Sequence, residues 1–439
     1  MGLRQSHGRI GRKSRKLSLV STSANIRNYA IITLTYWAFT LSDGALRMML
    51  LFHLHQLGHS ALTLASVFLL YEFFGIVTNL FSGWLSAKTG LKLTLGIGLI
   101  LQIIACAVLA GAESTLSVPF VIVLQGLSGI AKDFTKMSSK SYIKMVVPAG
   151  DQTQLLRWVA LLTGSKNTLK GVGYFLGGLL LATFGFHQAC LYMALCLFIT
   201  FIASMLSLPS SEGKRKATVT LRALLPSDVR LLYLSAARLF LFGSRDTWFV
   251  VGLPIFLSSV LGWSFETIGA ALATWIIGYG IIQASAPKFL GFQAVQTSSS
   301  NPKSTAKLLG FWKLLLLIPL ICICIALLGD LPLKLTLISG LSVFGFIFAA
   351  NSALHSFLVL DYAEHDNVTL SVGFYYMSNA AGRLVGTLLS GFLFQSFNGG
   401  MTGLIACLLG ALVLAGISAL FCVPLARAES KRARLETTT

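Results

Sequence analysis

The chain has 439 residues, of which 55% are hydrophobic and only 11% are charged. A soluble domain has about a quarter of its residues charged, so this composition excludes a soluble globular protein and predicts a polytopic membrane protein. At about 20 apolar residues a span, the length accommodates about twelve transmembrane helices.

Twelve apolar segments are expected to be helical spans, arranged as two bundles of six. The first bundle covers 29–208 and the second 231–424, with a polar connector at 209–230 and a tail at 425–439. We expect residues 1–28 to form a basic tail, with a transit peptide or N-myristoylation as alternatives. The predicted spans are 29–51, 61–86, 93–111, 118–139, 155–183, 188–207, 231–257, 266–286, 308–328, 333–358, 371–396 and 402–424.

The basic residues are distributed unevenly between the two sides of the predicted membrane. A formal net charge of +19 in a soluble protein would suggest a nucleic-acid partner. Here 25 of the 34 Lys and Arg lie in the tails, loops and span ends that share a side with the N-terminus, whereas the opposite loops carry only Lys334. The positive-inside rule therefore predicts that both termini are cytoplasmic, and no nucleic-acid partner is expected.

The first two spans carry charges that need partners. Asp43 precedes Arg47 by four residues, the favourable order for an ion pair along one helix face. This pair either neutralises itself so that the helix inserts, or places Arg47 against a substrate. Glu72 has no base nearby in the sequence, so it is a candidate for proton coupling, the alternative being an ion pair with an unidentified helix.

A row of lysines follows in the fourth span and its extension, where Lys132, Lys136, Lys140 and Lys144 recur every fourth residue. Such residues share one face of a helix. Because a charged side chain inside a bilayer costs about 2.5–3.5 kcal/mol, we expect the row to lead from the cytoplasmic rim into a water-filled cavity.

The fifth span contains Lys166 and Lys170 on one face, with nothing acidic within a helical turn. Its glycines are expected to let neighbouring helices approach closely. The span also takes part in a weak internal repeat, which predicts two halves of equal topology. Leu57-Gly-His-Ser60 recurs as Leu261-Gly-Trp-Ser264, and Gly164, Gly173 and Gly177 recur as Gly373, Gly382 and Gly386.

The second half adds three arginines. Arg238 and Arg245 are seven residues apart and share a face, from which Asp246 should be turned away by about a third of a turn. Arg383 lies in the eleventh span. The acidic segment 361–366 is expected to be a solvated loop.

The charges predicted at membrane depth favour an anion. Seven bases and four acids leave an excess of three positive charges, which is stable only beside water or a multiply charged anion. The alternative is that several bases belong to structural ion pairs. The candidate substrate-binding residues are Arg47, Lys132, Lys136, Lys166, Lys170, Arg238, Arg245 and Arg383, and the proton-coupling candidates are Asp43, Glu72, Asp133 and Asp246.

No catalytic or metal-binding motif competes with a transport function. The seven cysteines lie in or beside apolar segments, and Cys322 and Cys324 should point to nearly opposite faces of a helix. The sequence has no zinc-protease, P-loop or dinucleotide motif. We therefore expect no enzyme activity, metal or cofactor, and a transporter driven by an ion or exchange gradient.

Several stretches resemble known families. Residues Gly83 to Lys92 are similar to the loop between helices 2 and 3 of the major facilitator superfamily, although Ala87 stands where that family usually has an acid. Within this superfamily, the chain resembles the organoarsenical efflux permease family ArsJ from about Asn28 to Ser396. The resemblance rests on TYWAFTLSDGALRMMLLFHLHQLG, LLYEFFGIVTNLFSGWL, LSGIAKDFTKMSSKSYIK, LLTGSKNTLKGVGYFLGG, RLFLFGSRDTWFVVGLPIFL and GYGIIQASAP.

This resemblance implies a twelve-helix major facilitator fold with two six-helix bundles around a central cavity. The plasma (inner) membrane is the simplest location, with a eukaryotic cell or an organelle as the alternative because the N-terminal segment is basic and poor in acids. The resemblance also implies export of 1-arseno-3-phosphoglycerate, the ester formed when glyceraldehyde-3-phosphate dehydrogenase takes arsenate in place of phosphate. That dehydrogenase would be the functional partner, and export would confer arsenate resistance, with proton antiport through Glu72 or Asp43. The alternatives are a general organophosphate or drug exporter of the same fold, and a membrane sensor or scaffold that transports nothing.

Overall fold

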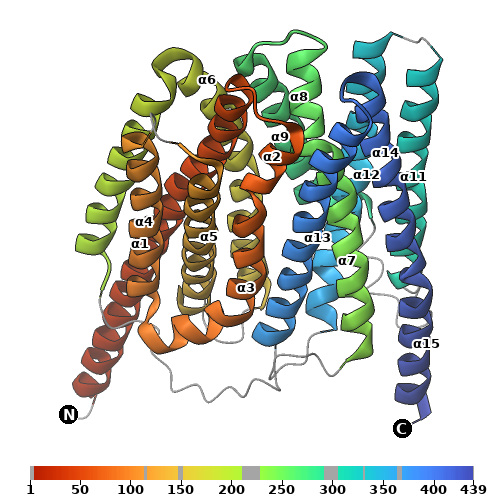
Figure 1. Cartoon of the computed structure of the whole chain (residues 1–439). Helices are drawn as coiled ribbons and strands as arrows, with labels where there is room; N and C mark the ends of the chain where they lie inside the picture. The colour runs from red at the N-terminus through yellow and green to blue at the C-terminus, as the bar shows by residue number, and fades with distance from the viewer. Residues whose placement is uncertain are drawn as a thin grey trace.

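The structure is a computed structural model that describes residues 4–112, 116–146, 152–209, 228–290, 305–329, 332–362 and 368–438. Within these ranges all regular secondary structure is helical, and Figure 1 shows the long helices standing side by side with both chain ends at the same end of the molecule. The first half contains α1 (Arg4–Gln56), α2 (Ala61–Val67), α3 (Leu69–Thr89), α4 (Leu91–Gly111), α5 (Val118–Val146) and α6 (Gln152–Ser207). The second half contains α7 (Val229–Phe249), α8 (Gly252–Ser259), α9 (Phe265–Phe289), α11 (Thr305–Leu328), α12 (Leu333–Asp361), α13 (Val368–Ser396), α14 (Gly400–Leu420) and α15 (Cys422–Thr438).

The predicted all-helical membrane fold is confirmed. Within the described ranges, nine segments are long and apolar enough to cross a membrane. One of them is the long element α6, which covers two predicted spans because the chain turns back at Gly185 (φ 73°, ψ 176°). The helices α1 and α13, which carry Asp43, Arg47 and Arg383, are not among the nine.

Both segments that we predicted to be tails are helical in the structure. The basic segment before residue 29 is helical from Arg4, and the segment after residue 424 is helical to Thr438. Arg and Lys favour helix almost as well as Leu, so a polar composition does not end a helix by itself. Residues 210–227 of the predicted connector lie outside the described ranges, as does most of the acidic segment 361–366.

The start of α7 is tied to α15 at the end of the molecule where both termini lie. Asp228 caps α7 by accepting the backbone N–H of Arg230 at 2.8 Å, and its Oδ2 also accepts Nη1 of Arg432 at 3.0 Å. Burial raises the pKa of Asp228, but the bonds from Arg230 and the charge of Arg432 hold that pKa below its ordinary value. The last helix is therefore anchored to the bundle by a charged pair.

Glycines set the packing inside each half. A Cβ built on Gly173 of α6 would lie 2.7 Å from the carbonyl oxygen of Leu41 in α1. In the second half, a Cβ on Gly386 of α13 would lie 2.5 Å from the carbonyl oxygen of Gly243 in α7. Gly177 and Gly382 meet α1 and α7 backbone in the same way. The close helix packing expected of these glycines is confirmed, and it is the same in the two halves.

The second predicted repeat also forms the same structure twice. Gly58 and Gly262 both adopt a positive φ, at 82° and 65°, a conformation that only glycine adopts without strain. Two residues later, Ser60 accepts the N–H of Thr63 at 3.3 Å, and Ser264 caps α9 in the same way. The turn between the first two spans thus matches the turn between the seventh and eighth.

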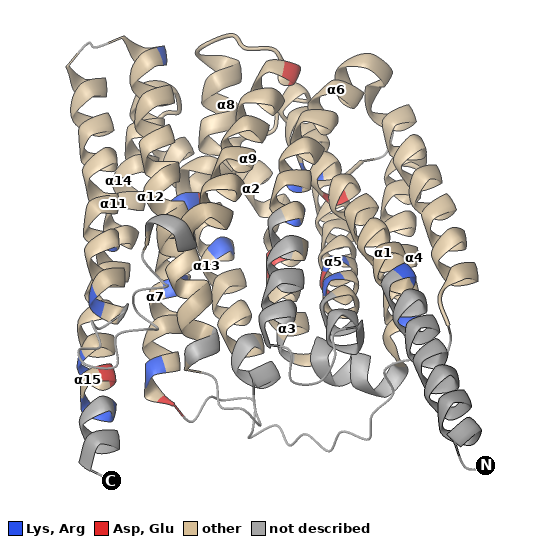
Figure 2. Ribbon diagram, turned by 180° about the vertical axis from the view of Figure 1, so that it is seen from behind, with Lys and Arg blue, Asp and Glu red and all other residues tan. Residues whose placement is uncertain are grey.

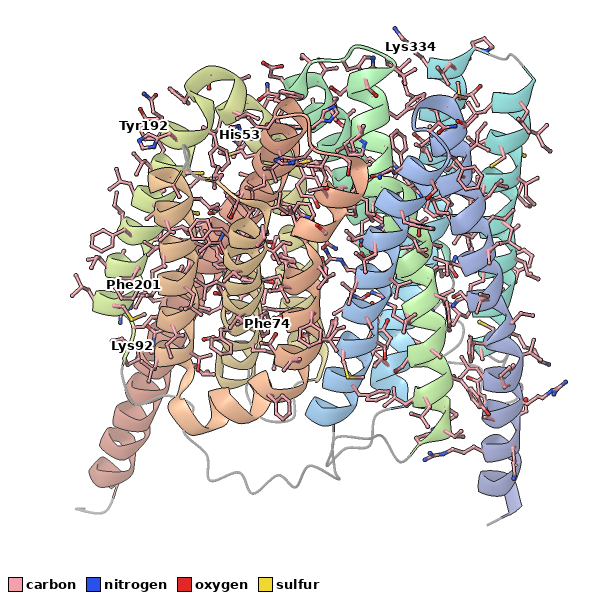
Figure 3. All side chains as sticks on the ribbon, in the orientation of Figure 1. His53, Phe74, Lys92, Tyr192, Phe201 and Lys334 are labelled. Carbon is pink, nitrogen blue, oxygen red and sulfur yellow. The ribbon has the colours of Figure 1, made fainter. Side chains whose placement is uncertain are left out.

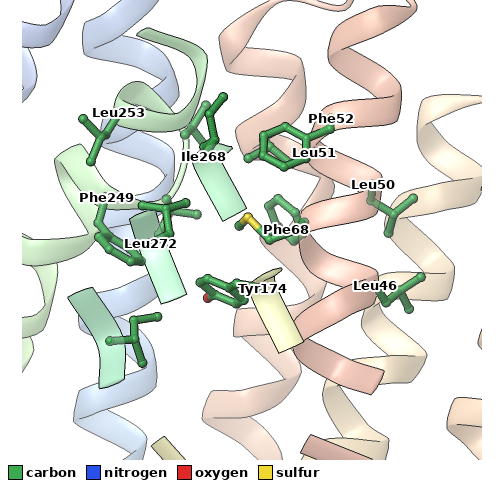
Figure 4. Packing of buried hydrophobic residues seen from close by; sticks show 14 of the residues in the cluster. Leu46, Leu50, Leu51, Phe52, Phe68, Tyr174, Phe249, Leu253, Ile268 and Leu272 are labelled. Atoms are coloured by element: carbon green, nitrogen blue, oxygen red, sulfur yellow. The ribbon is translucent and has the colours of Figure 1, made fainter. Parts of the chain in front are cut away.

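The two halves meet through α6 against α9 and through α2 and α3 against α13. Toward the end opposite the termini, the junction is apolar, and the rings of Phe52 and Phe265 stack with centroids 4.6 Å apart. Figure 4 shows side chains of α1 facing those of α7, α8 and α9 across this junction, with Phe68 and Tyr174 between them. Figure 3 places Lys334 at this same end and Lys92 toward the other.

The glycine contacts give a first prediction. Changing Gly386 to Ala should destabilise the protein by about 1–3 kcal/mol, because the new methyl group would overlap the backbone of α7. The thermal unfolding midpoint of the detergent-solubilised protein measures this effect. Gly278→Ala in α9 is the matched control, because a Cβ there has no described atom within 4 Å. Equal midpoints for the two variants would contradict the packing argument.

Candidate functional site

A buried carboxylate joins three helices at the junction of the two halves. Glu72 of α3 is fully buried, and its Oε1 accepts Nη1 of Arg47 in α1 at 3.0 Å. The same oxygen accepts Nη2 of Arg383 in α13 at 2.5 Å. The interpretation of Glu72 as an unpaired carboxyl is therefore wrong, and the alternative ion pair is found with partners from both halves.

The ion pairs continue from Arg383 into α7. Its Nε donates to Oδ2 of Asp246 at 3.2 Å, and Oδ1 of Asp246 lies 2.5 Å from Nη2 of Arg245. We expected Asp246 to face away from the arginines, which is wrong. The flexible side chain of Arg245 reaches the adjacent Asp246, and Arg383 contacts Asp246 from α13. Arg47, Glu72, Arg383, Asp246 and Arg245 thus form one continuous chain of ion pairs, which we call the central network.

The expected ion pair between Asp43 and Arg47 does not form. Arg47 pairs with Glu72 instead, and both carboxylate oxygens of Asp43 accept the hydroxyl of Tyr71, at 2.7 and 2.9 Å. The facing helix α3 supplies both partners through the adjacent residues Tyr71 and Glu72. Of the four acids at this junction, Asp43 is the one with no described cation within ion-pair distance.

The lysine row on α5 is only partly available. The side chain of Lys136 is buried, with its Nζ 2.5 Å from Asp133 and in hydrogen-bond contact with Asn79. Asp133 also accepts the hydroxyl of Thr78 at 2.6 Å. The ammonium of Lys136 also lies 5.6 Å from the ring centroid of Tyr376 in α13, so this cluster reaches the second half, and Lys136 is already ion-paired within the protein. The side chains of Lys140 and Lys144 lie outside the described residues.

Three cationic groups keep donors without a described partner. Arg47 is 3% exposed, yet its Nε and Nη2 are buried and make no hydrogen bond within the described residues. The ammonium of Lys132 lies 3.9 Å from the ring centroid of Tyr71, and that of Lys170 lies 5.5 Å from the ring centroid of Tyr174. Neither lysine has a hydrogen bond or ion pair to a described residue. Aromatic faces stabilise cations by only about 0.5–2 kcal/mol, so these groups remain able to bind an anion.

Lys166 and Arg238 lie outside the central network. Lys166 is half-buried on α6, one turn before Lys170. Arg238 of α7 donates to Asn379 at 2.9 Å and to Ser352 at 3.1 Å, both in the second half. The ring of Phe242 separates it from the central network, since Arg238 lies 3.9 Å and Arg245 4.8 Å from the centroid of that ring.

Two buried basic side chains were missed by the sequence analysis. Lys313 of α11 is 1% exposed and donates to Ser418 at 2.5 Å and to the carbonyl oxygen of Ala237 at 3.3 Å. Its place inside an uninterrupted apolar run was the available signal. His355 of α12 is also fully buried, and neither ring nitrogen has a hydrogen-bond partner within the described part of the chain.

Metal-binding chemistry has no support in the described ranges, where no three His, Cys, Asp or Glu side chains come together. All seven cysteines are free. As predicted, Cys322 is exposed and Cys324 is buried, so the two point to different sides of α11.

Comparisons with known proteins agree with this architecture. The profile of the Major Facilitator Superfamily matches residues 32–326. A search of curated proteins found no match. Among solved structures, the chain is similar to a POT family transporter in complex with 5-aminolevulinic acid, with TM-score 0.70, 15% identity, and coverage of 91% of this chain and 96% of that chain. It is likewise similar to a POT family transporter in complex with a thioalcohol conjugated peptide, with TM-score 0.69, 14% identity and the same coverage.

The central network predicts a large effect at Glu72. Changing Glu72 to Gln should destabilise the protein by about 3–5 kcal/mol, because it leaves the buried guanidiniums of Arg47 and Arg383 without their shared carboxylate. Adding Arg383→Gln should recover part of the loss, because one unpaired charge is removed with the other. Thermal unfolding of the single and double variants measures this coupling.

Glu266→Gln at the start of α9 is the control for the Glu72 experiment, since Glu266 has no ion pair within the described residues and should change stability by less than about 0.5 kcal/mol. If the effects of Glu72→Gln and Arg383→Gln simply add, the ion pair across the two halves does not stabilise the fold.

Proposed function

Since the chain belongs to the Major Facilitator Superfamily, we propose that it is a secondary active transporter that exports a multiply charged organic anion. We propose further that this anion is 1-arseno-3-phosphoglycerate. This proposal rests on three buried or half-buried cationic side chains, Arg47, Lys132 and Lys170. Each has N–H donors that form no hydrogen bond with an acid at the junction among the described residues.

Charge balance supports an anionic substrate. The eight candidate bases, Lys136 included, outnumber the four acids at the junction by four. Three of the acids already lie within 3.2 Å of cations, so they cannot neutralise the rest. A ligand with two anionic ends would compensate this excess, whereas a cationic or neutral ligand would not.

The residue types suit a phosphate-like group at each end of the ligand. The planar guanidinium of Arg47 offers a two-donor edge, Nε with Nη2, that matches a phosphate or arsenate oxygen pair. Lys132 and Lys170 supply point charges on flexible stems, from which a transported ligand dissociates easily. The two lysines lie on α5 and α6, so a ligand bound between them and Arg47 would contact three helices of the first half.

The ion pairs of Glu72 could link substrate binding to movement of the two halves. A ligand anion that approaches Arg47 and Arg383 competes with the carboxylate that now holds them together. Release of Arg383 from Glu72 would loosen α13 from α3, which is a contact between the halves. We infer that substrate binding and rocking of the two bundles are linked through this exchange of anions.

The identity of the anion rests on the resemblance to the organoarsenical permeases. The proposed substrate carries one phosphate and one arsenate group on a three-carbon acid, which agrees with the charge excess. Its source would be glyceraldehyde-3-phosphate dehydrogenase, which makes it from glyceraldehyde 3-phosphate, NAD⁺ and arsenate and releases NADH and a proton. A general organophosphate exporter has the same charge requirement, so a test must use the dehydrogenase to separate the two.

Asp43 is the favoured site for proton coupling. Glu72, Asp133 and Asp246 each form an ion pair, whereas Asp43 accepts only the hydroxyl of Tyr71 among the described residues. Its loss of a proton would change the local charge without breaking an ion pair. The proposed setting is the plasma membrane with both termini in the cytoplasm.

The substrate proposal is tested by arsenate resistance in a sensitive bacterial strain. We expect resistance and low arsenic accumulation only when the chain is expressed together with the dehydrogenase. Lys170→Gln and Lys166→Gln should weaken transport by about 10- to 100-fold, because each removes a charged donor from the site. Lys334→Gln at the opposite end is the control and should leave resistance intact.

Membrane abundance of every variant is compared by immunoblot, so that loss of transport is separated from loss of insertion. Resistance without the dehydrogenase would identify arsenate itself as the substrate. Unchanged resistance in both well-inserted lysine variants would contradict the basic site.

Proton coupling is tested at Asp43. In membrane vesicles, wild-type transport should rise when a pH gradient is imposed, and Asp43→Asn should remove this response while counterflow exchange of substrate persists, because exchange needs no net proton movement. Tyr71→Phe removes only the hydrogen-bond donor and should keep the response. If Asp43→Asn still responds fully to the gradient, the proton is carried elsewhere.

A further inference from the structure

A groove on the outside of the second half is unexplained by transport through the junction. It lies between α11 on one side and the α14–α15 pair on the other, with a volume of about 1340 Å³. Figure 1 shows these helices side by side at the edge of the molecule, with α15 reaching the end where both termini lie. The groove is separate from the central network, none of whose residues line it.

Small residues line part of the groove. They are Gly310 of α11 and Gly416, Ala419 and Ala426 of α14 and α15. A Cβ on Gly416 would have no described atom within 4 Å, so the absence of a side chain there is not required by helix packing. The space at this position is therefore open to a ligand.

The walls are apolar and exposed. Phe311 and Leu314 of α11 are 57% and 59% exposed, and Leu420 and Val423 are 68% and 50% exposed. In a helix that spans a bilayer, such side chains contact hydrocarbon. An occupant of this part of the groove must therefore be as apolar as an acyl chain.

Both walls change from apolar to basic toward the end of the molecule where the chain termini lie, and Figure 2 shows Lys and Arg in blue on α15 near the C-terminus. On α11 the groove-lining residues run from Leu314 and Phe311 to Lys307, and along α14 and α15 they run from Leu420 and Val423 to Arg427 and Lys431. Spacings of three and four residues keep each series on one helix face. The exposed hydroxyl of Ser430 lies in the same basic rim.

Two other charged residues of α15, Glu429 and Arg432, are bound to residues outside the groove-lining set or to backbone. Glu429 accepts the hydroxyl of Tyr362 at 3.0 Å and the backbone N–H of Ala306 at 3.2 Å. Arg432 is bound to Asp228. In contrast, Arg427 and Lys431 form no ion pair with a described residue, and both line the groove. Their charges are therefore available to an occupant.

We propose that this groove is a binding site for an anionic diacyl phospholipid. Its acyl chains lie along Phe311, Leu314 and Leu420, and its phosphate is bound by Arg427 and Lys431. A zwitterionic lipid has the same phosphate but brings its own cation toward the basic rim, so a lipid with net negative charge is favoured. This site is independent of the proposed substrate, because it lies outside the junction of the two halves.

Native mass spectrometry of the purified full-length protein tests the site. The probes are 1-palmitoyl-2-oleoyl phosphatidylglycerol and the matched phosphatidylcholine, titrated into the delipidated protein. Wild type should bind the first phosphatidylglycerol about tenfold more tightly than phosphatidylcholine, and the double variant Arg427→Gln/Lys431→Gln should lose that preference. Lys334→Gln, which removes a charge at the opposite end, should keep it.

A second variant tests the groove rather than its charge. Gly416→Phe fills the open space and should lower occupancy by phosphatidylglycerol at least tenfold while the unfolding midpoint in lipid-free detergent stays unchanged. Equal binding of the two lipids by wild type, or an unchanged preference in the double variant, would overturn the proposal. Displacement of phosphatidylglycerol by glycerol 1-phosphate would also overturn it, because it would identify a site for soluble anions.

Discussion

One carboxylate, that of Glu72, holds together guanidiniums from the two halves of the protein. Removing a carboxylate and two guanidiniums from water is costly, and the cost is offset only where the partners meet at hydrogen-bond distance. Arg47 and Arg383 both do so, at 3.0 and 2.5 Å. The positions of α1, α3 and α13 relative to one another are therefore constrained by a single charged oxygen.

The glycines make this arrangement possible. Gly173 and Gly177 of α6 let that helix pack closely on α1, which carries Arg47, by meeting the α1 backbone directly. The equivalent glycines of α13 seat α7, so that Asp246 comes within reach of Arg383. The glycine contacts occur in both halves and position the helices within each half. The ion pairs between the halves have no such repeat, and they determine the charge of the junction.

Much of the architecture was predictable because it depends on local properties of the chain. Apolar segment length predicts spans, so α4 (Leu91–Gly111) nearly matches the predicted span 93–111, and glycine spacing predicted close packing on α6 without identifying its partner. The partners of Glu72 were not predictable, because one of them follows 311 residues later and its helix face is set by tertiary packing. Proximity in sequence was even misleading for Asp43, whose neighbour Arg47 has a better partner on the facing helix. The burial of Lys313 was not predictable, because hydropathy gives the extent of a span but not the direction in which one of its side chains points.

Export of the arsenylated ester is measured most directly as arsenic uptake by inverted membrane vesicles. In these vesicles, export from the cytoplasm becomes accumulation inside. The vesicles carry this chain and receive radiolabelled arsenate together with glyceraldehyde 3-phosphate, NAD⁺ and the dehydrogenase. We expect label to accumulate only when all four are supplied, and accumulation to be lost when Arg47 is changed to Gln in well-inserted protein. Accumulation from arsenate alone, or full accumulation by the Arg47 variant, would contradict export of a doubly anionic ester through the basic junction of the two halves.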